Sequence, residues 1–239
     1  MGKIFNKIVY FRTLNSTNDY LINLYKKHLV KNNFIIVSKY QKKGRGRIGK
    51  MWFSDSNSVT FSFSIQLTKD LSAWQINMAV SLALNRVLKG FCVQSLIKYP
   101  NDIIVKSQKI AGILTEVISV KKTKWCIVGV GVNVNNMRFP VEIPHAISMK
   151  QILLKSINQN TVFDNFFSEL ESLLIQKRNL QKNYLLDLYG GGEFVACLYK
   201  GNFVNVKILS VSNDGLLKIS TKDSSIKIVK DEDVKFVLS

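Results

Sequence analysis

The chain has 239 residues, 46% of them hydrophobic, which is enough for one sizeable catalytic core and a small appended module. Its apolar runs are much shorter than the ~20 residues of a membrane-spanning helix, and Met1–Phe11 lacks a continuous hydrophobic stretch, so we expect neither a membrane span nor a secretory signal. The net charge of +18 permits non-specific nucleic-acid binding, but the 34 basic residues are scattered, which favours solvated lysines.

Short strands and helices are predicted along the first half of the chain. A strand at Ile8–Leu14 precedes Asn15–Asn18, whose side chains can cap a following helix, and a second strand is expected at Phe34–Tyr40. From Val59 to Leu67 apolar and polar residues alternate, which is typical of a half-buried antiparallel strand. A helix at Ala73–Lys89 then precedes strands at Ser95–Lys98, Ile110–Val120 and Trp125–Asn133.

In the second half of the chain the predicted secondary structure changes from helices to short strands at a run of glycines. Helices are predicted at Met149–Ser156 and Val162–Tyr189, and Gly190–Gly192 then marks a domain boundary between residues 1–189 and 190–239. Short β runs follow, with a hairpin signal at Asn213–Gly215, and they predict a small barrel or sandwich. These runs are Phe194–Tyr199, Phe203–Val211, Leu216–Ser220, Ser225–Val229 and Val234–Leu238.

Cysteines and histidines give no sign of a metal site. Cys92, Cys126 and Cys197 are odd in number and widely spaced, which fits reduced thiols in a cytoplasmic protein. The two histidines lie far from each other and from any cysteine pair, so zinc is not expected.

A basic, glycine-rich segment at Gln41–Met51, the glycine–arginine loop, follows the second strand. Gly44–Gly49 satisfies the G-x-G-x-x-G pattern, but a strand and not a helix is predicted after it, so we reject a dinucleotide site. Met51 stands where a phosphate-binding P-loop needs Ser or Thr, so that interpretation also fails. The loop suits binding of phosphate or carboxylate, and a solvated basic hairpin is an equally open interpretation.

Four segments, in order, resemble the signature of the biotin-protein ligase family. They are Ser16-Thr17-Asn18; Gln41–Trp52, similar to Q-x-x-G-R-G-R-x-G-R-x-W; Lys98–Asp102 with Lys109–Glu116, similar to K-W-P-N-D and K-x-A-G-I-L-x-E; and Gly129–Asn135, similar to G-x-G-x-N-x-N. The resemblance implies an α+β catalytic domain like that of class II aminoacyl-tRNA synthetases, with a mixed, mostly antiparallel sheet and a C-terminal SH3-like β-barrel. Because the match begins near Ile8, it also implies the short form without an N-terminal DNA-binding domain.

The resemblance implies a two-step reaction. The carboxylate of biotin attacks the α-phosphate of ATP, which is bound with Mg²⁺, and a lysine of a biotin carboxyl carrier protein domain then attacks the resulting biotinyl-5'-adenylate. Both reactants of the first step are anionic, so cations must offset their repulsion. By resemblance, Arg47 and Lys109 would serve there, and Asp102 would orient or deprotonate the acceptor lysine.

Binding residues follow from the same motifs. The ureido ring of biotin requires neutral polar partners in an apolar slot, and Ser16, Thr17, Asn18 and Gln41 have that chemistry. Gly112 would form a wall of the slot, and Arg45 and Gly46 would add backbone contacts. The residues implied to bind ATP or the adenylate are Arg45, Arg47, Lys50, Trp52, Asn101, Lys109 and Asn133.

Plainer roles compete with several of these assignments. Ser16–Asn18 could be a helix cap alone, Lys109 a solvent-facing lysine, Asp102 part of a turn, and Asn133 a strand-end cap. Two residues depart from the family pattern, Tyr99 in place of Trp and Lys50 in place of Arg, and the stretch at 136–147 gives no hint of which residue covers the adenine.

Three other functions stay open. A lipoate- or octanoate-protein ligase shares the superfamily, but an acyl chain leaves the polar set of Ser16–Asn18 and Gln41 unsatisfied. A nucleic-acid-binding module and a non-catalytic biotin-binding protein are the remaining alternatives, although no specific DNA binding is expected. The sequence leaves monomer and homodimer open, and adjacent like charges predict that the loop orders when biotin binds.

Overall fold

The computed structural model describes residues 4–5, 7–176 and 179–238, which form two sheets and five named helices. The helices are α1 Thr17–Lys26, α2 Ala73–Gly90, α3 Met149–Leu153, α4 Gln159–Gln176 and α5 Leu180–Leu186. The strands of the large sheet are β1 Lys7–Leu14, β2 Phe34–Gln41, β3 Ser58–Gln66, β4 Leu96–Lys98, β5 Asp102–Val105, β6 Gln108–Val120 and β7 Thr123–Asn133. Those of the C-terminal sheet are β8 Val195–Tyr199, β9 Asn202–Val211, β10 Leu217–Thr221, β11 Ile226–Val229 and β12 Val234–Phe236.

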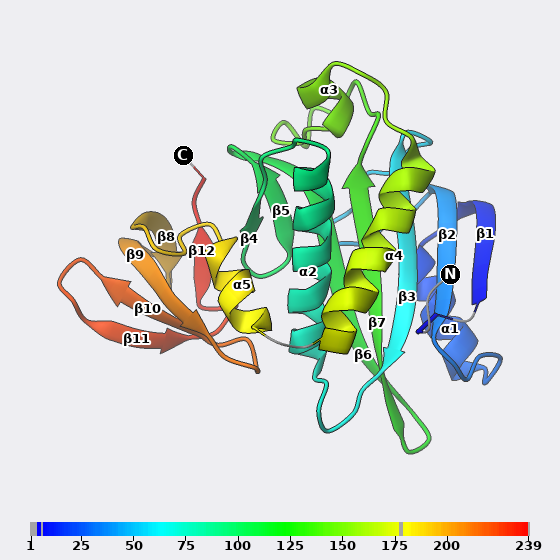
Figure 1. Cartoon of the computed structure of the whole chain (residues 1–239), viewed down its shortest axis with the longest axis horizontal. Coiled ribbons are helices and arrows are strands. Elements are labelled where there is room, and N and C mark those ends of the chain that lie inside the picture. Colours follow the sequence, from blue (N-terminus) through cyan, green and yellow to red (C-terminus); the bar gives the residue numbers. More distant parts are fainter. Residues whose placement is uncertain (1–3, 6, 177–178, 239) are drawn as a thin grey trace.

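The large sheet is mixed and mostly antiparallel, as predicted. Its strand order is β1-β2-β3-β7-β6-β5-β4, and β1 pairs with β2 in parallel while the other neighbours pair antiparallel. Strand β5 is absent from the sequence prediction, because its short run Ile103–Val105 follows a Pro-Asn-Asp that we interpreted as a turn. Helices α2 and α4 cover one face of this sheet and α1 covers the other (Figure 1).

Strand β3 is buried on both faces, so the predicted half-burial is wrong. Phe61 and Phe63 pack against the aromatic rings of α4, as the alternation indicates. The polar face is covered by α1, and Ser62 and Ser64 are fully buried there with hydrogen bonds to that helix. These buried hydroxyls have hydrogen-bond partners, so polar residues at alternate positions do not by themselves show that one face of a strand is exposed to solvent.

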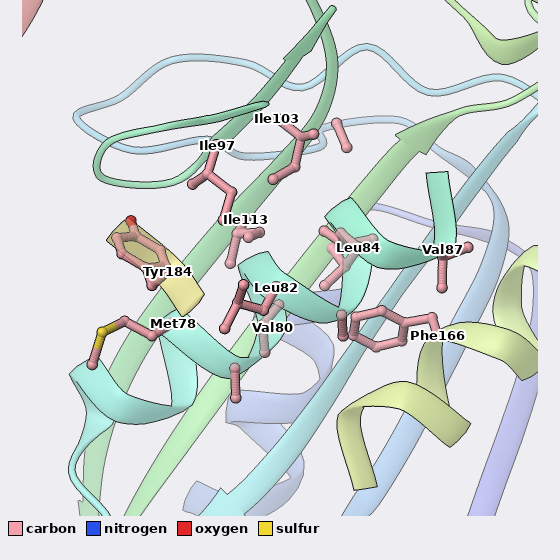
Figure 2. Close-up of a cluster of buried hydrophobic side chains, with 14 of the residues drawn as sticks. Met78, Val80, Leu82, Leu84, Val87, Ile97, Ile103, Ile113, Phe166 and Tyr184 are labelled. Atoms are coloured by element: carbon pink, nitrogen blue, oxygen red, sulfur yellow. The ribbon is translucent and has the colours of Figure 1, made fainter. Parts of the chain in front are cut away.

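Helix α2 lies at the centre of the main core. Ser72 caps its first turn in a capping box with Gln75, and the apolar residues Met78, Leu82 and Val87 are buried (Figure 2). Among the described residues, no helix is long and apolar enough to cross a membrane.

The predicted helix Val162–Tyr189 is two helices, α4 and α5. Asn179 has a left-handed backbone, φ 58°, directly before α5, which a continuous helix cannot contain. The preceding helix is also shorter than predicted, because Leu154 is left-handed at φ 55° and ends α3. Apolar periodicity carries no information on such single-residue breaks.

The C-terminal strands form a five-stranded antiparallel sheet in the order β11-β10-β9-β8-β12, which lies beyond α5 (Figure 1). The predicted hairpin turn joins β9 to β10 and contains Gly215 at φ 84°. Pairing of β11 with β12 does not occur among the described strands, so the sheet is not closed into a barrel by backbone hydrogen bonds. Its buried residues continue the core of the large sheet: Tyr99 Oη donates to the Gly215 carbonyl at 2.8 Å and its ring meets Phe236 edge-on.

Candidate active site

One cavity of about 770 Å³ is lined by every residue that the sequence nominates for the site. The nominated residues are Ser16, Thr17, Asn18, Gln41, Arg45, Gly46, Arg47, Lys50, Trp52, Asn101, Asp102, Lys109, Gly112 and Asn133. The cavity is also lined by Lys98, Tyr99, residues 142–146, and Asp231, Glu232 and Lys235 from the C-terminal part of the chain. Segments from the whole length of the chain therefore meet at one place.

The glycine–arginine loop is a tight hairpin. The Gly46 N–H donates to the Lys50 carbonyl at 2.7 Å, and the Lys50 N–H donates to the Arg47 carbonyl at 3.1 Å. Ile48 and Gly49, between them, both have positive φ, as a type I′ turn requires. No helix opens at the loop, because an irregular stretch leads from Trp52 to β3, which agrees with rejecting the dinucleotide motif.

A buried polar cluster joins the start of α1 to β2 and β3. The Thr17 N–H and Oγ1 both donate to Gln41 Oε1, at 2.8 and 3.0 Å. Ser62 Oγ lies 2.7 Å from Thr17 Oγ1 and 2.6 Å from Asn18 Oδ1. Gln41 Nε2 has no hydrogen-bond partner among the described residues, so it is a donor available to a ligand. Ser16 also caps α1, since its Oγ accepts from the Asp19 N–H, so the cap expected for this segment is present and its binding role stays a prediction.

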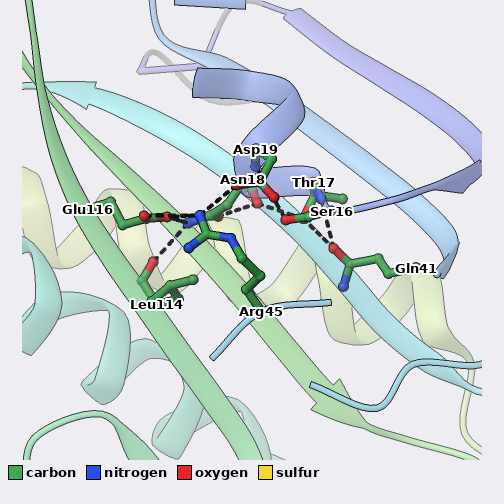
Figure 3. A network of polar contacts seen from close by, with 9 residues as sticks. Ser16, Thr17, Asn18, Asp19, Gln41, Arg45, Leu114 and Glu116 are labelled. Carbon is green, nitrogen blue, oxygen red and sulfur yellow. Dashed lines mark hydrogen bonds and ion pairs between the residues drawn. The ribbon is translucent and has the colours of Figure 1, made fainter. Parts of the chain in front are cut away.

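Arg45 is paired with two carboxylates. Its Nη2 lies 2.6 Å from Asp19 Oδ1 and 2.8 Å from Glu116 Oε2, and Glu116 Oε2 also accepts from Asn18 Nδ2 at 2.8 Å (Figure 3). Partial burial lowers the pKa of Arg45, but the hydrogen bonds to Asp19 and Glu116 outweigh it, so the pKa is raised overall. The arginine stays charged and its charge is offset locally.

The two nominated catalytic cations also have carboxylate partners. Lys109 Nζ lies 2.6 Å from Asp102 Oδ1, and Arg47 pairs with Asp231. Lys109 lines the cavity with its amine 5.5 Å from the centroid of the Trp52 ring, so it is not a freely solvated lysine. These four groups form a charged cluster in which each cation has a partner that an anionic ligand could replace.

A half-buried lysine, Lys98, lies beside this cluster. Burial lowers its pKa, and repulsion from Lys109 and nearby lysines adds to that effect, while attraction to Asp102 opposes it. The cavity lining contains six cationic side chains and four carboxylates, which suits an anionic ligand. The cations are Arg45, Arg47, Lys50, Lys98, Lys109 and Lys235, and the carboxylates are Asp102, Glu142, Asp231 and Glu232.

Trp52 lies on a floor made of two glycines. Gly112 and Gly131 are register partners on β6 and β7. A Cβ on Gly131 would lie 2.2 Å from Trp52 Cε2, and one on Gly112 would lie 3.0 Å from Trp52 Cζ3, so only glycine permits this contact. The Trp52 Nε1 is buried and lacks a hydrogen-bond partner among the described residues, which makes it a second unused donor.

The side-chain amides of Asn101 and Asn133 are hydrogen-bonded to backbone carbonyls. Asn101 Nδ2 donates to the Ile113 carbonyl at 2.8 Å, and Asn133 Nδ2 donates to the Ile147 carbonyl at 3.1 Å. Both side chains line the cavity, but these amide N–H groups hold strands in place. Their predicted contacts with ATP stay predictions, and the strand-end role expected for Asn133 is present.

Sequence reasoning missed several residues around the cavity. Glu116 is the last residue of the Lys109–Glu116 motif, so its position was a usable signal. Asp231 and residues 142–146 had no such signal, because they lie in segments without a motif. The structure brings residues 142–146 to the cavity by pairing Lys109 with Ala146 in a parallel bridge, which supplies candidates for covering a base.

Metal-binding geometry is not found in the described part of the chain, where no group of three or more His, Cys, Asp or Glu side chains could hold an ion. The carboxylates that reach the cavity include Glu142, Asp231 and Glu232. They could supplement the oxygens of a phosphate ligand around Mg²⁺, which commonly keeps waters and substrate phosphates as ligands.

Comparisons with known proteins give a family model that matches the chain and several relatives of similar sequence. The model of the biotin/lipoate A/B protein ligase family matches residues 10–133, just over half of the chain. The bifunctional ligase/repressor BirA of Bacillus subtilis (strain 168) is 26% identical over 242 residues, covering 92% of this chain and 71% of BirA. The biotin–[acetyl-CoA-carboxylase] ligase of Mycobacterium tuberculosis is 28% identical over 160 residues, covering 64% of this chain and 58% of that protein.

Solved structures share the fold over almost the full chain. A biotin protein ligase from Aquifex aeolicus, in complex with biotin and ATP, superimposes with a TM-score of 0.79 at 24% identity, covering 98% of this chain and 99% of that one. A biotin acetyl coenzyme A carboxylase synthetase from Helicobacter pylori, with bound biotinylated ATP, gives a TM-score of 0.64 at 24% identity, with 93% and 99% covered.

Proposed function

The chain belongs to the biotin/lipoate A/B protein ligase family, and from this premise we propose that it is a biotin-protein ligase. It would activate biotin with ATP as biotinyl-5'-adenylate and transfer the biotinyl group to a lysine of an acceptor protein. We propose a biotin carboxyl carrier domain as the acceptor, in keeping with the carboxylase ligase among the relatives.

The observation that carries the proposal is the buried polar cluster of Thr17, Asn18 and Gln41 in the same cavity as Arg47 and Lys109. A ureido group offers a carbonyl acceptor and N–H donors, and Gln41 Nε2 is a free donor that can meet the carbonyl. A dithiolane or alkyl chain would leave the same donor buried and unpaired, which costs about 1–3 kcal/mol. The cavity chemistry therefore favours biotin over lipoate or octanoate.

In the first step a carboxylate oxygen of biotin attacks the α-phosphorus of ATP. The new P–O bond forms as the bond to the leaving pyrophosphate breaks. Arg47 and Lys109 supply the positive charge that this approach of two anions requires, and each must exchange its present carboxylate partner, Asp231 or Asp102, for substrate oxygen. Mg²⁺ would enter with ATP and offset the charge on the departing pyrophosphate.

In the second step the neutral amine of the acceptor lysine attacks the biotinyl carbonyl. The amide bond forms as the bond to AMP breaks, and the proton released from the nitrogen passes to the departing phosphate or to water. A lysine amine has a reference pKa of about 10.4, so it must lose a proton before it attacks. Asp102 lies on the cavity wall, is partly exposed and contacts Lys109, where it can accept a hydrogen bond from the incoming amine. We assign it the orientation of that amine.

The test is biotin-dependent exchange of labelled pyrophosphate into ATP, measured beside lipoate and octanoate. We expect exchange with biotin alone, and a fall of about 10²–10³-fold in Arg47→Ala, because a charge-stabilising group is removed. Arg86→Ala is the matched control, since Arg86 pairs with Glu169 on α4 and does not line the cavity. Exchange with lipoate or octanoate but not biotin would move the assignment to the other branch of the family, and no exchange with any acid would refute it.

A further inference from the structure

The two arginines of the glycine–arginine loop contact different parts of the protein. Arg47 pairs with Asp231 of the C-terminal part of the chain, in the charged cluster with Lys109 and Asp102. Arg45 instead contacts Asp19 of α1 and Glu116 of β6, and both of these carboxylates bind the same nitrogen, Nη2. Its positive charge is therefore already compensated, and its side chain is a tether between the loop and two elements of the fold.

Glu116 is the shared member of this tether. One oxygen, Oε2, accepts from Arg45 of the loop and from Asn18 of α1, both at 2.8 Å, and Oε1 also contacts Arg45 at 3.0 Å (Figure 3). Glu116 lies four residues beyond Gly112 on β6, so its side chain points to the same face of the strand as the glycine floor. A single carboxylate thus joins three segments that are far apart in sequence.

Asn18, at the other end of this contact, is held in a fixed place. Its side chain packs on Gly129, where a Cβ would lie 2.3 Å from Asn18 Oδ1, and that oxygen lies 2.6 Å from Ser62 Oγ. Asn18 Nδ2 reaches Glu116, with only a longer contact of 3.4 Å to the Leu114 carbonyl as an alternative. Glu116 thus holds the nitrogen end of the Asn18 amide, while Ser62 holds its oxygen end.

We propose that Glu116, together with Asp19, is a positioning residue that holds the glycine–arginine loop closed through Arg45 and fixes Asn18 by the same contact. The inference rests on the proposed function, in which Asn18 belongs to the biotin pocket. If the loop opens, Arg45 leaves two carboxylates close to each other with no cation between them, and this repulsion favours the closed loop. Closure of the loop and organisation of the biotin pocket are therefore coupled by one side chain that touches neither substrate.

The test is Glu116→Gln, which keeps the size of the side chain and removes its charge. Glu169→Gln is the matched control, because Glu169 also pairs with an arginine, Arg86, at similar exposure but away from the cavity. Biotin affinity is measured by calorimetry without ATP, and loop closure by the rate of tryptic cleavage within residues 42–50, where the cleavage sites are unchanged in both variants.

We expect Glu116→Gln to weaken biotin binding about tenfold and to speed loop cleavage about fivefold, while Glu169→Gln changes neither. In pyrophosphate exchange the KM for biotin should rise about tenfold and kcat should fall less than threefold, a split that general destabilisation would not produce. Arg45→Met should also speed loop cleavage at the tryptic sites that it retains, and adding Glu116→Gln to it should speed that cleavage no further, because the two residues act on the loop as one unit.

Several outcomes separate this inference from the proposed function. Wild-type exchange with unchanged biotin affinity and unchanged loop cleavage in Glu116→Gln overturns the inference and leaves the enzyme assignment intact. Absence of exchange in the wild type refutes the assignment, while the loop-cleavage comparison still decides whether the tether exists. If Glu116→Gln does not fold, Arg45→Met tests the same contact from the loop side. This variant loses one tryptic site, so cleavage is compared at the sites that remain, Lys42, Lys43, Arg47 and Lys50, and an unchanged rate there overturns the tether.

Discussion

Replacing Gly131 by alanine tests whether Trp52 must lie on the glycine floor. The added Cβ would stand 2.2 Å from Trp52 Cε2 and 2.5 Å from Nε1, whereas ordinary contact begins at 3.4 Å, so the indole must retreat by about 1 Å or more. The displacement reaches the loop directly, because the Trp52 N–H donates to the Gly44 carbonyl at 2.9 Å.

The size of the effect follows from this shift. A misplacement of about 1 Å at an active site can reduce catalysis about 10²-fold, and we expect that loss in kcat/KM for biotin-dependent pyrophosphate exchange. Crowding of a packed position costs about 1–3 kcal/mol, which in a chain of this size lowers Tm by roughly 2–12 °C. Activity should therefore fall far more than the folded fraction at assay temperature.

Gly90→Ala is the matched control. Gly90 is the last residue of α2 and a Cβ there meets nothing within 4 Å, so alanine should stabilise the fold by about 0.5–1 kcal/mol with exchange unchanged. A Gly131→Ala protein that is folded and exchanges pyrophosphate at the wild-type rate would refute the role given to the floor. So would a Trp52→Ala background in which Gly131→Ala still causes its full loss, because the effect must act through the indole.

Two further predictions concern the cavity mouth and the core. Asp231→Asn frees Arg47 from an ion pair that is about one-third exposed and worth about 0.2–1 kcal/mol, so the KM for ATP in the exchange assay should fall by up to about fivefold; an increase would show that Asp231 positions Arg47 rather than competing with the ligand. Tyr25→Phe should cost about 1–3 kcal/mol at pH 7, because Tyr25 Oη lies 2.7 Å from the Asn32 carbonyl and 2.8 Å from Ser64 Oγ. Burial raises the pKa of Tyr25 from 10.0 to about 12, so the folded state holds the proton longer than the unfolded state, and stability is lost as pH rises from 10 to 12. Urea unfolding across that range should show a shallower loss in Tyr25→Phe, and an unchanged slope would contradict the titration.

Local sequence signals predicted the elements whose geometry is local. Ser16 caps α1, the alternation from Val59 gives β3, and Asn213–Gly215 turns between β9 and β10, since each depends on neighbours in the chain. The predictions that were wrong concern features that depend on residues distant in the sequence or on single backbone angles. The burial of Ser62 is decided by α1 covering that face, and the start of α5 follows a left-handed Asn179. Neither feature changes the periodicity of the sequence.

For the site, the motifs nominated residues that share one cavity, but not how their charges are paired. Lys109 with Asp102 lies within one motif region, so their proximity could be anticipated from the hairpin of β5 and β6. The pairing of Arg47 with Asp231 joins positions 184 residues apart, and only the packing of the C-terminal sheet creates it. The sequence therefore indicated which residues carry the chemistry, while the ion-pair partner of each cation is known only from the fold.

The apolar core that runs from the large sheet into the C-terminal sheet has a thermodynamic consequence. Tyr99 hydrogen-bonds Gly215 and packs on Phe236, while it also lines the cavity, so removing the C-terminal strands would expose part of the cavity wall to water. The two sheets should then melt together in one calorimetric transition rather than two. A substitution on β12 would change substrate affinity. Replacing the C-terminal strands by those of a relative would likewise require compensating changes in the cavity wall that these strands support.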